Sequence, residues 1–273
     1  GLEVNIACEL ICAAICHQIN WNFLRQAIKT RTEKDCSWIS GRNLLKISGT
    51  DIHQMLKDYS YPERIRAHER AKLLQDLGKM VGDTGNYRSI FFDTTMSLRP
   101  FKDIINKLLT SQIFSQDPNK KKLRLSIQRL SNLDELQDLA QYNQPAIDYH
   151  LIRNYLRRGL IYPKTQYAKS FIHNSDIVRR ESTVGSMRKL CCDVMKRIKD
   201  LTTLNISTIN SIEWHISRSV CVQRDADCHL KSKEAEWLKV VFSKCPFCET
   251  CVSYRYKKDS NEISEPSYSG KSY

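Results

Sequence analysis

Apolar residues recur at helical spacing in several long stretches of this sequence, and this periodicity restricts the fold more than any other feature. The clearest case is the stretch 145–160, P-A-I-D-Y-H-L-I-R-N-Y-L-R-R-G-L, in which the apolar residues fall on one side of a helix. Pro145 precedes this helix and Asp148 falls in its first turn. The same spacing over 4–30 and 207–221 predicts two further helices, so the chain is expected to be all-α.

Composition and charge restrict the partners. The chain has 273 residues, 41% of them hydrophobic, which is enough to bury a large core. Its 43 Lys and Arg against 30 Asp and Glu leave a net charge of +13, which favours nucleic acid as the partner ahead of an anionic membrane surface. A basic surface that serves only solubility is the alternative, since charge alone does not separate the two.

The distribution of cysteines and apolar residues indicates an intracellular protein. No run of about eighteen uncharged apolar residues occurs, so no membrane span is expected. Glu3 and Glu9 stand where a secretory signal would carry basic residues. The 11 cysteines are an odd number, which argues against a disulfide scaffold and for a reducing compartment. The cytoplasm, with its nucleoid, or the nucleus is therefore the expected location, and a monomer is expected.

Five cysteines lie close together near the end of the chain, at Cys221, Cys228, Cys245, Cys248 and Cys251. Free thiols rarely crowd in this way unless they bind a metal, so the stretch 221–251 is expected to be a metal loop. Thiolates serve either an iron-sulfur cluster or tetrahedral zinc, and His229 is an alternative zinc ligand. Five thiols compete for four positions.

Asp148 has two interpretations. The first is a helix cap, because an aspartate at a helix N-terminus accepts hydrogen bonds from the free amides there. The second comes from the whole string D-x-H-L-x-R followed by R-G-L, which resembles the segment V-D-x-H-V-x-R followed by R-x-G of the helix-hairpin-helix DNA glycosylases. In that superfamily the aspartate is the catalytic carboxylate, which the resemblance assigns to Asp148.

The resemblance extends to two more stretches. Gln18, in C-H-Q-I-N-W, matches a glutamine near the nucleic acid on an early helix of the family. The interval of six residues between Cys221 and Cys228 matches the first interval of the family's C-x6-C-x2-C-x5-C cluster motif, and this match favours [4Fe-4S] over zinc. The expected substrate and nucleic-acid contacts are His17, Gln18, Trp21, Lys121, Lys122, Tyr142, His150 and Arg153.

The sequence departs from the family in two regions. After Cys228 the cluster motif is not kept, because sixteen residues separate Cys228 from Cys245 and the final interval is missing. The second departure lies ahead of Asp148. Members carry a glycine-rich hairpin, L-P-G-V-G-x-x-T-A, ahead of the aspartate, whereas here no glycine occurs between Gly85 and Gly159. No lysine matches the family's lysine nucleophile, so water is expected to attack the sugar in a monofunctional reaction. The missing hairpin motivates two alternatives: a non-catalytic nucleic-acid-binding protein of the same fold, and a glycosidase acting on RNA or on a free nucleoside or nucleotide.

The resemblance implies a two-lobed helical bundle with a C-terminal cysteine-rich metal loop. The central lobe is expected to cover 31–160 and to contain the degenerate hairpin region and Asp148. Residues 1–30 are expected to join 161–273 in the second lobe. The implied activity is hydrolysis of the N-glycosidic bond of a damaged or modified base that is flipped out of DNA.

Overall fold

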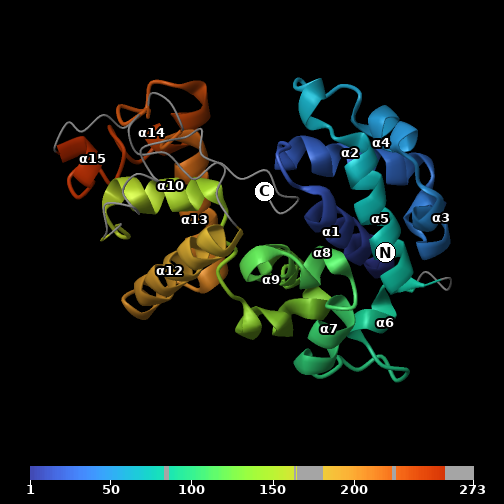
Figure 1. Cartoon of the computed structure of the whole chain (residues 1–273). Coiled ribbons are helices and arrows are strands. Elements are labelled where there is room, and N and C mark those ends of the chain that lie inside the picture. Colours follow the sequence, from blue (N-terminus) through green and yellow to red (C-terminus); the bar gives the residue numbers. More distant parts are fainter. Residues whose placement is uncertain (83–85, 163, 165–180, 223–225, 256–273) are drawn as a thin grey trace. The chain divides into compact units, whose positions relative to one another are not determined.

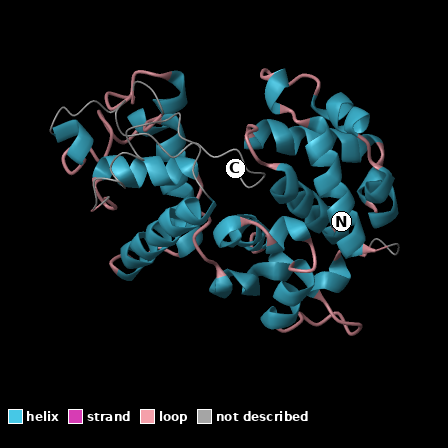
Figure 2. Ribbon diagram, in the orientation of Figure 1, coloured by secondary structure: helices cyan, strands magenta, loops and turns pink. Residues whose placement is uncertain are grey.

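The computed structural model of this chain describes residues 1–82, 86–162, 164, 181–222 and 226–255. Every regular element in these residues is a helix (Figure 2). One isolated bridge pairs Phe92 with Leu98. The expectation of an all-α protein is confirmed for this part of the chain. The chain divides into two compact units, Gly1–Asn143 and a second that begins at Gln144.

The first unit is built from α-helices and short 3-10 helices (Figure 1), which in chain order are α1 Leu2–Ile15, α2 Trp21–Lys34, η1 Cys36–Ile39, α3 Gly41–Lys46, α4 Gly49–Leu56, η2 Pro62–Arg64, α5 Ala67–Val81, α6 Arg88–Phe91, α7 Phe101–Leu108, α8 Gln112–Ser115, η3 Pro118–Lys120, α9 Lys121–Leu130 and η4 Asp134–Tyr142. Helix α1 is its centre, since α2, α5 and α9 all pack against it. Its apolar residues, such as Ile6, Leu10, Ile11 and Ala14, are fully buried. A helix that is apolar around its circumference is buried on all sides.

The single helix expected over 4–30 is two helices. The helical backbone ends at Cys16, and Gln18 adopts a positive φ of 54°. Asn20 then starts α2, because its side-chain oxygen accepts hydrogen bonds from the amides of Asn22 and Phe23. Apolar spacing continues across the break, so periodicity alone did not reveal it.

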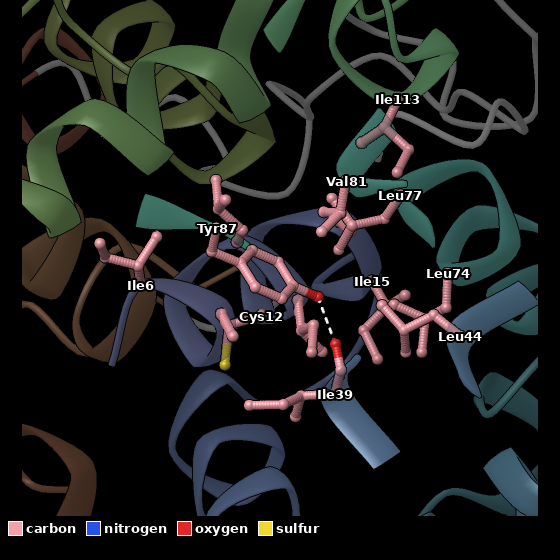
Figure 3. Close-up of a cluster of buried hydrophobic side chains, with 14 of the residues drawn as sticks. Ile6, Cys12, Ile15, Ile39, Leu44, Leu74, Leu77, Val81, Tyr87 and Ile113 are labelled. Atoms are coloured by element: carbon pink, nitrogen blue, oxygen red, sulfur yellow. Dashed lines mark hydrogen bonds between the residues drawn. The ribbon is translucent and has the colours of Figure 1, made fainter. Parts of the chain in front are cut away.

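Tyr87 ties two segments of the first core together (Figure 3). Its ring is fully buried, and its hydroxyl donates a hydrogen bond of 2.6 Å to the carbonyl oxygen of Ile39. Burial raises the pKa of Tyr87, which keeps this donor protonated. The hydroxyl therefore satisfies a carbonyl that lies in an apolar cluster with Ile6, Cys12 and Leu77.

Replacing Tyr87 with Phe should lower the free energy of unfolding by about 2 kcal/mol, because the carbonyl of Ile39 then has no donor. Urea denaturation followed by circular dichroism measures the change. Tyr61→Phe is the matched control, since Tyr61 is exposed, and it should leave the stability unchanged. Equal stability of the two variants would contradict the role assigned to the buried hydroxyl.

The second unit consists of α10 Tyr149–Arg158, α12 Glu181–Asp200, α13 Ile206–Ser219, η5 Lys233–Ala235, α14 Glu236–Lys239 and α15 Val252–Arg255 (Figure 1). Helix α10 packs against α12, α13 and α15. One apolar cluster joins α10 to α12 through residues such as Tyr155 and Met195. A second cluster contains Ile216 and Leu238 together with the thiols Cys245 and Cys248.

The division into units differs from the expected lobes. Residues 1–30 belong to the first unit, and the boundary between Asn143 and Gln144 assigns Asp148 to the second. The physical reason is the burial of α1 by α2, α5 and α9. Part of the stretch 161–273 lies outside the described residues.

Among the described helices, none combines the length and the apolar character needed to cross a bilayer.

Candidate functional site

Two features of the second unit are candidates for function, and α10 carries residues of both. Asp148 stands immediately before α10, and Arg157 and Arg158 at its other end reach a cavity lined by cysteines. Helices α10 and α13 pack together, so residues of α13 complete both features.

Asp148 is the N-cap of α10. Its Oδ1 accepts a hydrogen bond from the amide of Leu151 at 3.1 Å, and its Oδ2 accepts one from Nε1 of Trp214 at 2.8 Å. The side chain is only 8% exposed. The cap interpretation is therefore confirmed, and the catalytic one stays a prediction. Each oxygen accepts a hydrogen bond from an N–H donor, so the negative charge is stabilised and the orientation of the carboxylate is fixed.

Trp214 is a site residue that the sequence analysis missed. It lies within a predicted helix, and its apolar ring gave no reason to expect a contact with a carboxylate 66 residues away. His150 contacts both Trp214 and Arg153. Its ring packs edge-on against Trp214, and its Nδ1 lies 2.9 Å from Nη2 of Arg153. The structure thus brings Asp148, His150 and Trp214 together.

Arg153 has a different role from the nucleic-acid contact expected of it. Its side chain is 1% exposed, and its guanidinium donates to the carbonyl oxygens of Cys221 at 2.6 Å and Ser217 at 3.2 Å. Arg157, also buried, donates to the carbonyl of Val222. The two cations therefore satisfy a carbonyl in the last turn of α13, that of Ser217, and two carbonyls just after the helix, those of Cys221 and Val222. This correction follows from burial, which the sequence pattern did not show.

Replacing Arg153 with Gln should destabilise the second unit by about 3 kcal/mol, because two buried carbonyls lose a charged donor. Urea denaturation measures the loss. Arg218→Gln, which alters a less buried arginine of α13, is the control and should cost much less. A stable Arg153→Gln protein that binds nucleic acid poorly would restore the original prediction of a surface contact.

The cysteine-lined cavity has a volume of about 340 Å³. Its wall contains all five expected thiols, Cys221, Cys228, Cys245, Cys248 and Cys251, together with Arg157, Arg158, His229 and Phe247. The backbone amide of Cys245 donates to the carbonyl of Cys228 at 2.8 Å, which brings these two cysteines together. Arg157 donates to Sγ of Cys221 at 3.6 Å, and Sγ of Cys251 donates to the carbonyl of Arg157 at 3.4 Å.

The pKa values of two thiols in this cavity are raised by burial and by the neighbouring thiols. Burial, followed by the neighbouring thiols Cys245 and Cys248, raises the pKa of Cys228 to about 12. Burial likewise raises the pKa of Cys245 to about 12. Such thiols ionise at neutral pH only when a cation replaces their protons. The donor set therefore fits a thiolate-bound metal. Within the described residues, however, no group of three or more His, Cys, Asp or Glu side chains is arranged to hold a metal ion.

The remaining expected contacts lie in the first unit, and several are buried there. Lys122 is 2% exposed and donates to the carbonyl of Ala14 at 2.8 Å, beside Arg70, which donates to the carbonyl of Ile15 at 3.2 Å. These cations satisfy the C-terminal carbonyls of α1. Lys122 is thus a capping residue of α1, which corrects its expected role as a phosphate contact. Lys121 is buried as well.

His17 lies in the same buried basic cluster. Its Nε2 is 3.3 Å from Oε1 of Glu69, and its side chain has no exposed surface. Burial, followed by Arg70 and Lys122, holds the pKa of His17 well below its usual range, so the ring is neutral at pH 7. A buried neutral ring is a core residue here, in place of the expected substrate contact.

Three of the expected contacts in the first unit keep accessible surface. Gln18 and Trp21 are half-buried, and Trp21 lies 5.7 Å from the guanidinium carbon of Arg129. Tyr142 is exposed, and its ring stacks on Phe101 with centroids 4.0 Å apart. Their role in binding stays a prediction.

Comparison with known proteins supplies no relative, since no family model, no curated protein and no solved structure matches the chain. The fold and the two features define an all-helical protein with a capped carboxylate and a cysteine-lined cavity in one unit.

Proposed function

We propose that this chain is an N-glycosylase that hydrolyses the bond between a damaged or modified base and its sugar in nucleic acid, with DNA as the first candidate substrate. The observation that carries the proposal is the geometry of Asp148. Its carboxylate is nearly excluded from water, and its two oxygens are oriented by the amide of Leu151 and the indole of Trp214. Because the carboxylate is already oriented before the reaction, it does not have to move when a cationic transition state forms.

The proposed reaction assigns one task to Asp148. The C–N bond breaks and its electron pair leaves with the base, so the sugar becomes an oxocarbenium-like cation. Asp148 stabilises this cation and directs a water to the anomeric carbon, and the proton of that water passes to the departing base or to solvent. Water is the nucleophile in this scheme, since no lysine at the site matches the family's nucleophile. Lys122, a buried lysine of the first unit, donates a hydrogen bond to the carbonyl of Ala14.

We further propose that four of the five cavity thiols hold a [4Fe-4S] cluster. The cluster would supply a covalent cross-link that folds the loop 221–251, which has little apolar core of its own. All five thiols line one cavity of about 340 Å³. The choice of a cluster over zinc rests on the interval between Cys221 and Cys228, which resembles the family's cluster motif. Zinc bound by thiols and His229 is the alternative.

The net charge of +13 supports a polyanionic partner, and free thiols support a reducing compartment such as the cytoplasm or the nucleus. We propose that the protein acts there as a monomer.

An assay of base release tests the proposal directly. Purified protein is incubated with duplexes and single strands that carry deaminated, alkylated or oxidised bases, with RNA and with free nucleotides. Chromatography then detects the released base, and alkaline cleavage detects the abasic site. Release of a base from DNA, without strand cleavage before alkali, is the expected result. Binding to all of these substrates without release from any would overturn the enzyme and leave the non-catalytic binding protein.

A further inference from the structure

A row of five aromatic rings runs across the second unit from α10 to α14. We call it the aromatic row, and its members are Tyr149, His150, Trp214, His215 and Trp237. Neighbouring ring centroids lie 4.0, 6.3, 5.1 and 5.9 Å apart in that order. Residues from three helices, far apart in the sequence, thus form one row of neighbouring rings.

The two indoles of this row are held in place by the protein. Nε1 of Trp214 donates to Oδ2 of Asp148 at 2.8 Å, and Nε1 of Trp237 donates to Oγ of Ser219 at 3.3 Å. An indole has a single hydrogen-bond donor, so what remains for a ligand is the ring itself. The row is also graded in exposure. Trp237 is 46% exposed and His215 is exposed, whereas Trp214 is half-buried beside the carboxylate.

One cation beside the row, Arg218, suits an anionic ligand. The guanidinium carbon of Arg218 lies 5.1 Å from the centre of the Trp214 ring, in a cation–π contact. Burial, followed by the charge of Arg218, lowers the pKa of His215, so this ring is neutral at pH 7 and presents an aromatic surface. The chain as a whole carries 13 more positive than negative charges.

We propose that the aromatic row binds single-stranded nucleic acid by stacking unpaired bases on His215 and Trp237, and that it leads the strand toward Asp148. Bases within a duplex stack on one another, whereas unpaired bases offer their faces to aromatic side chains. Stacking tolerates any sequence, and the adjacent Arg218 supplies a charge for the backbone. The direction toward Asp148 rests on the proposed function, whereas strand binding itself needs no catalysis.

The test compares Trp237→Ala with Trp237→Phe in the full-length protein. Fluorescence anisotropy measures binding to a labelled single strand of about twelve nucleotides and to the matching duplex. Trp237→Ala should weaken binding to the single strand about ten-fold, and Trp237→Phe should retain most of the affinity because the ring is kept. His215→Ala, a second exposed position, should also weaken the single-strand complex.

Tyr61→Ala is the matched control, because Tyr61 is an exposed aromatic residue of the first unit and its loss should leave binding unchanged. Circular dichroism confirms that the variants fold. Unchanged affinity in both Trp237→Ala and His215→Ala overturns the proposal. An equal loss with the duplex, or binding to vesicles that contain phosphatidylserine but not to oligonucleotides, overturns it as well.

The two proposals fail separately. If the protein releases bases but binds single strands equally well without Trp237, the proposed reaction stands and the role of the aromatic row is rejected. If strand binding depends on Trp237 but no base is released, the role of the aromatic row stands and the proposed reaction is rejected.

Discussion

Asp148→Asn should reduce base release about a thousand-fold while the protein stays folded. Asparagine is as good a helix cap as aspartate, so the bond to the amide of Leu151 is preserved. What is lost is the negative charge opposite the sugar, together with the hydrogen bond from Nε1 of Trp214, because an amide has one acceptor oxygen. The stability cost should be about 1 kcal/mol, measured by urea denaturation. This one substitution therefore removes the negative charge of residue 148 while it retains the helix cap.

Two further variants sharpen this result. Asp117→Asn is the matched control, since Asp117 is a buried carboxylate that accepts from the amide of Lys122, and it should leave base release intact. Trp214→Phe keeps a ring but removes the donor to Oδ2, so it should lower the rate of base release less than Asp148→Asn does. Wild-type activity in Asp148→Asn would leave Asp148 as a structural cap only.

Replacing Cys248 with Ser should remove the metal from the protein. Metal content should fall from about one cluster per chain, or about one zinc, to near zero, and the second unit should unfold at a lower urea concentration. Cys248 is the most buried of the cavity thiols, at 1% exposure, and its Sγ lies 3.7 Å from the carbonyl of Cys228. Elemental analysis of protein purified without oxygen measures the loss. A brown colour identifies iron and sulfide, and colourless protein with one zinc identifies the alternative.

Cys191→Ser is the control for this experiment. Cys191 is fully buried in the core between α10 and α12, away from the cavity wall, and its substitution should lower the stability but leave the metal content unchanged. Serine at each of the five cavity positions then identifies the spare thiol, because four variants should lose the metal and one should keep it. Wild-type protein free of both iron and zinc would exclude the metal centre.

Some parts of the candidate site were predictable from the sequence because they depend on neighbours in the chain. Asp148 was expected at the start of a helix and caps it through Leu151, three residues on. The spacing of the cysteines likewise predicted that they would gather, and all five line one cavity. Local hydrogen bonding and short loops are properties of nearby residues, so a sequence pattern reports them.

Other parts depend on contacts that no local pattern encodes. Arg153 and Lys122 are basic residues next to expected site residues, and a basic side chain on a helix usually faces solvent. Both are instead buried against the C-terminal carbonyls of helices distant in the sequence. The contact of Trp214 with Asp148, and the order of rings in the aromatic row, belong to the same category.

The sequence by itself determined that this protein is helical, that a helix begins at Asp148, and that its five C-terminal thiols cluster. The tertiary structure decided which helices form each unit, which arginines and lysines are buried, and which rings surround the carboxylate. The physical reason is range: helical periodicity and capping act over a few residues, whereas burial and side-chain contacts between helices depend on how distant segments pack.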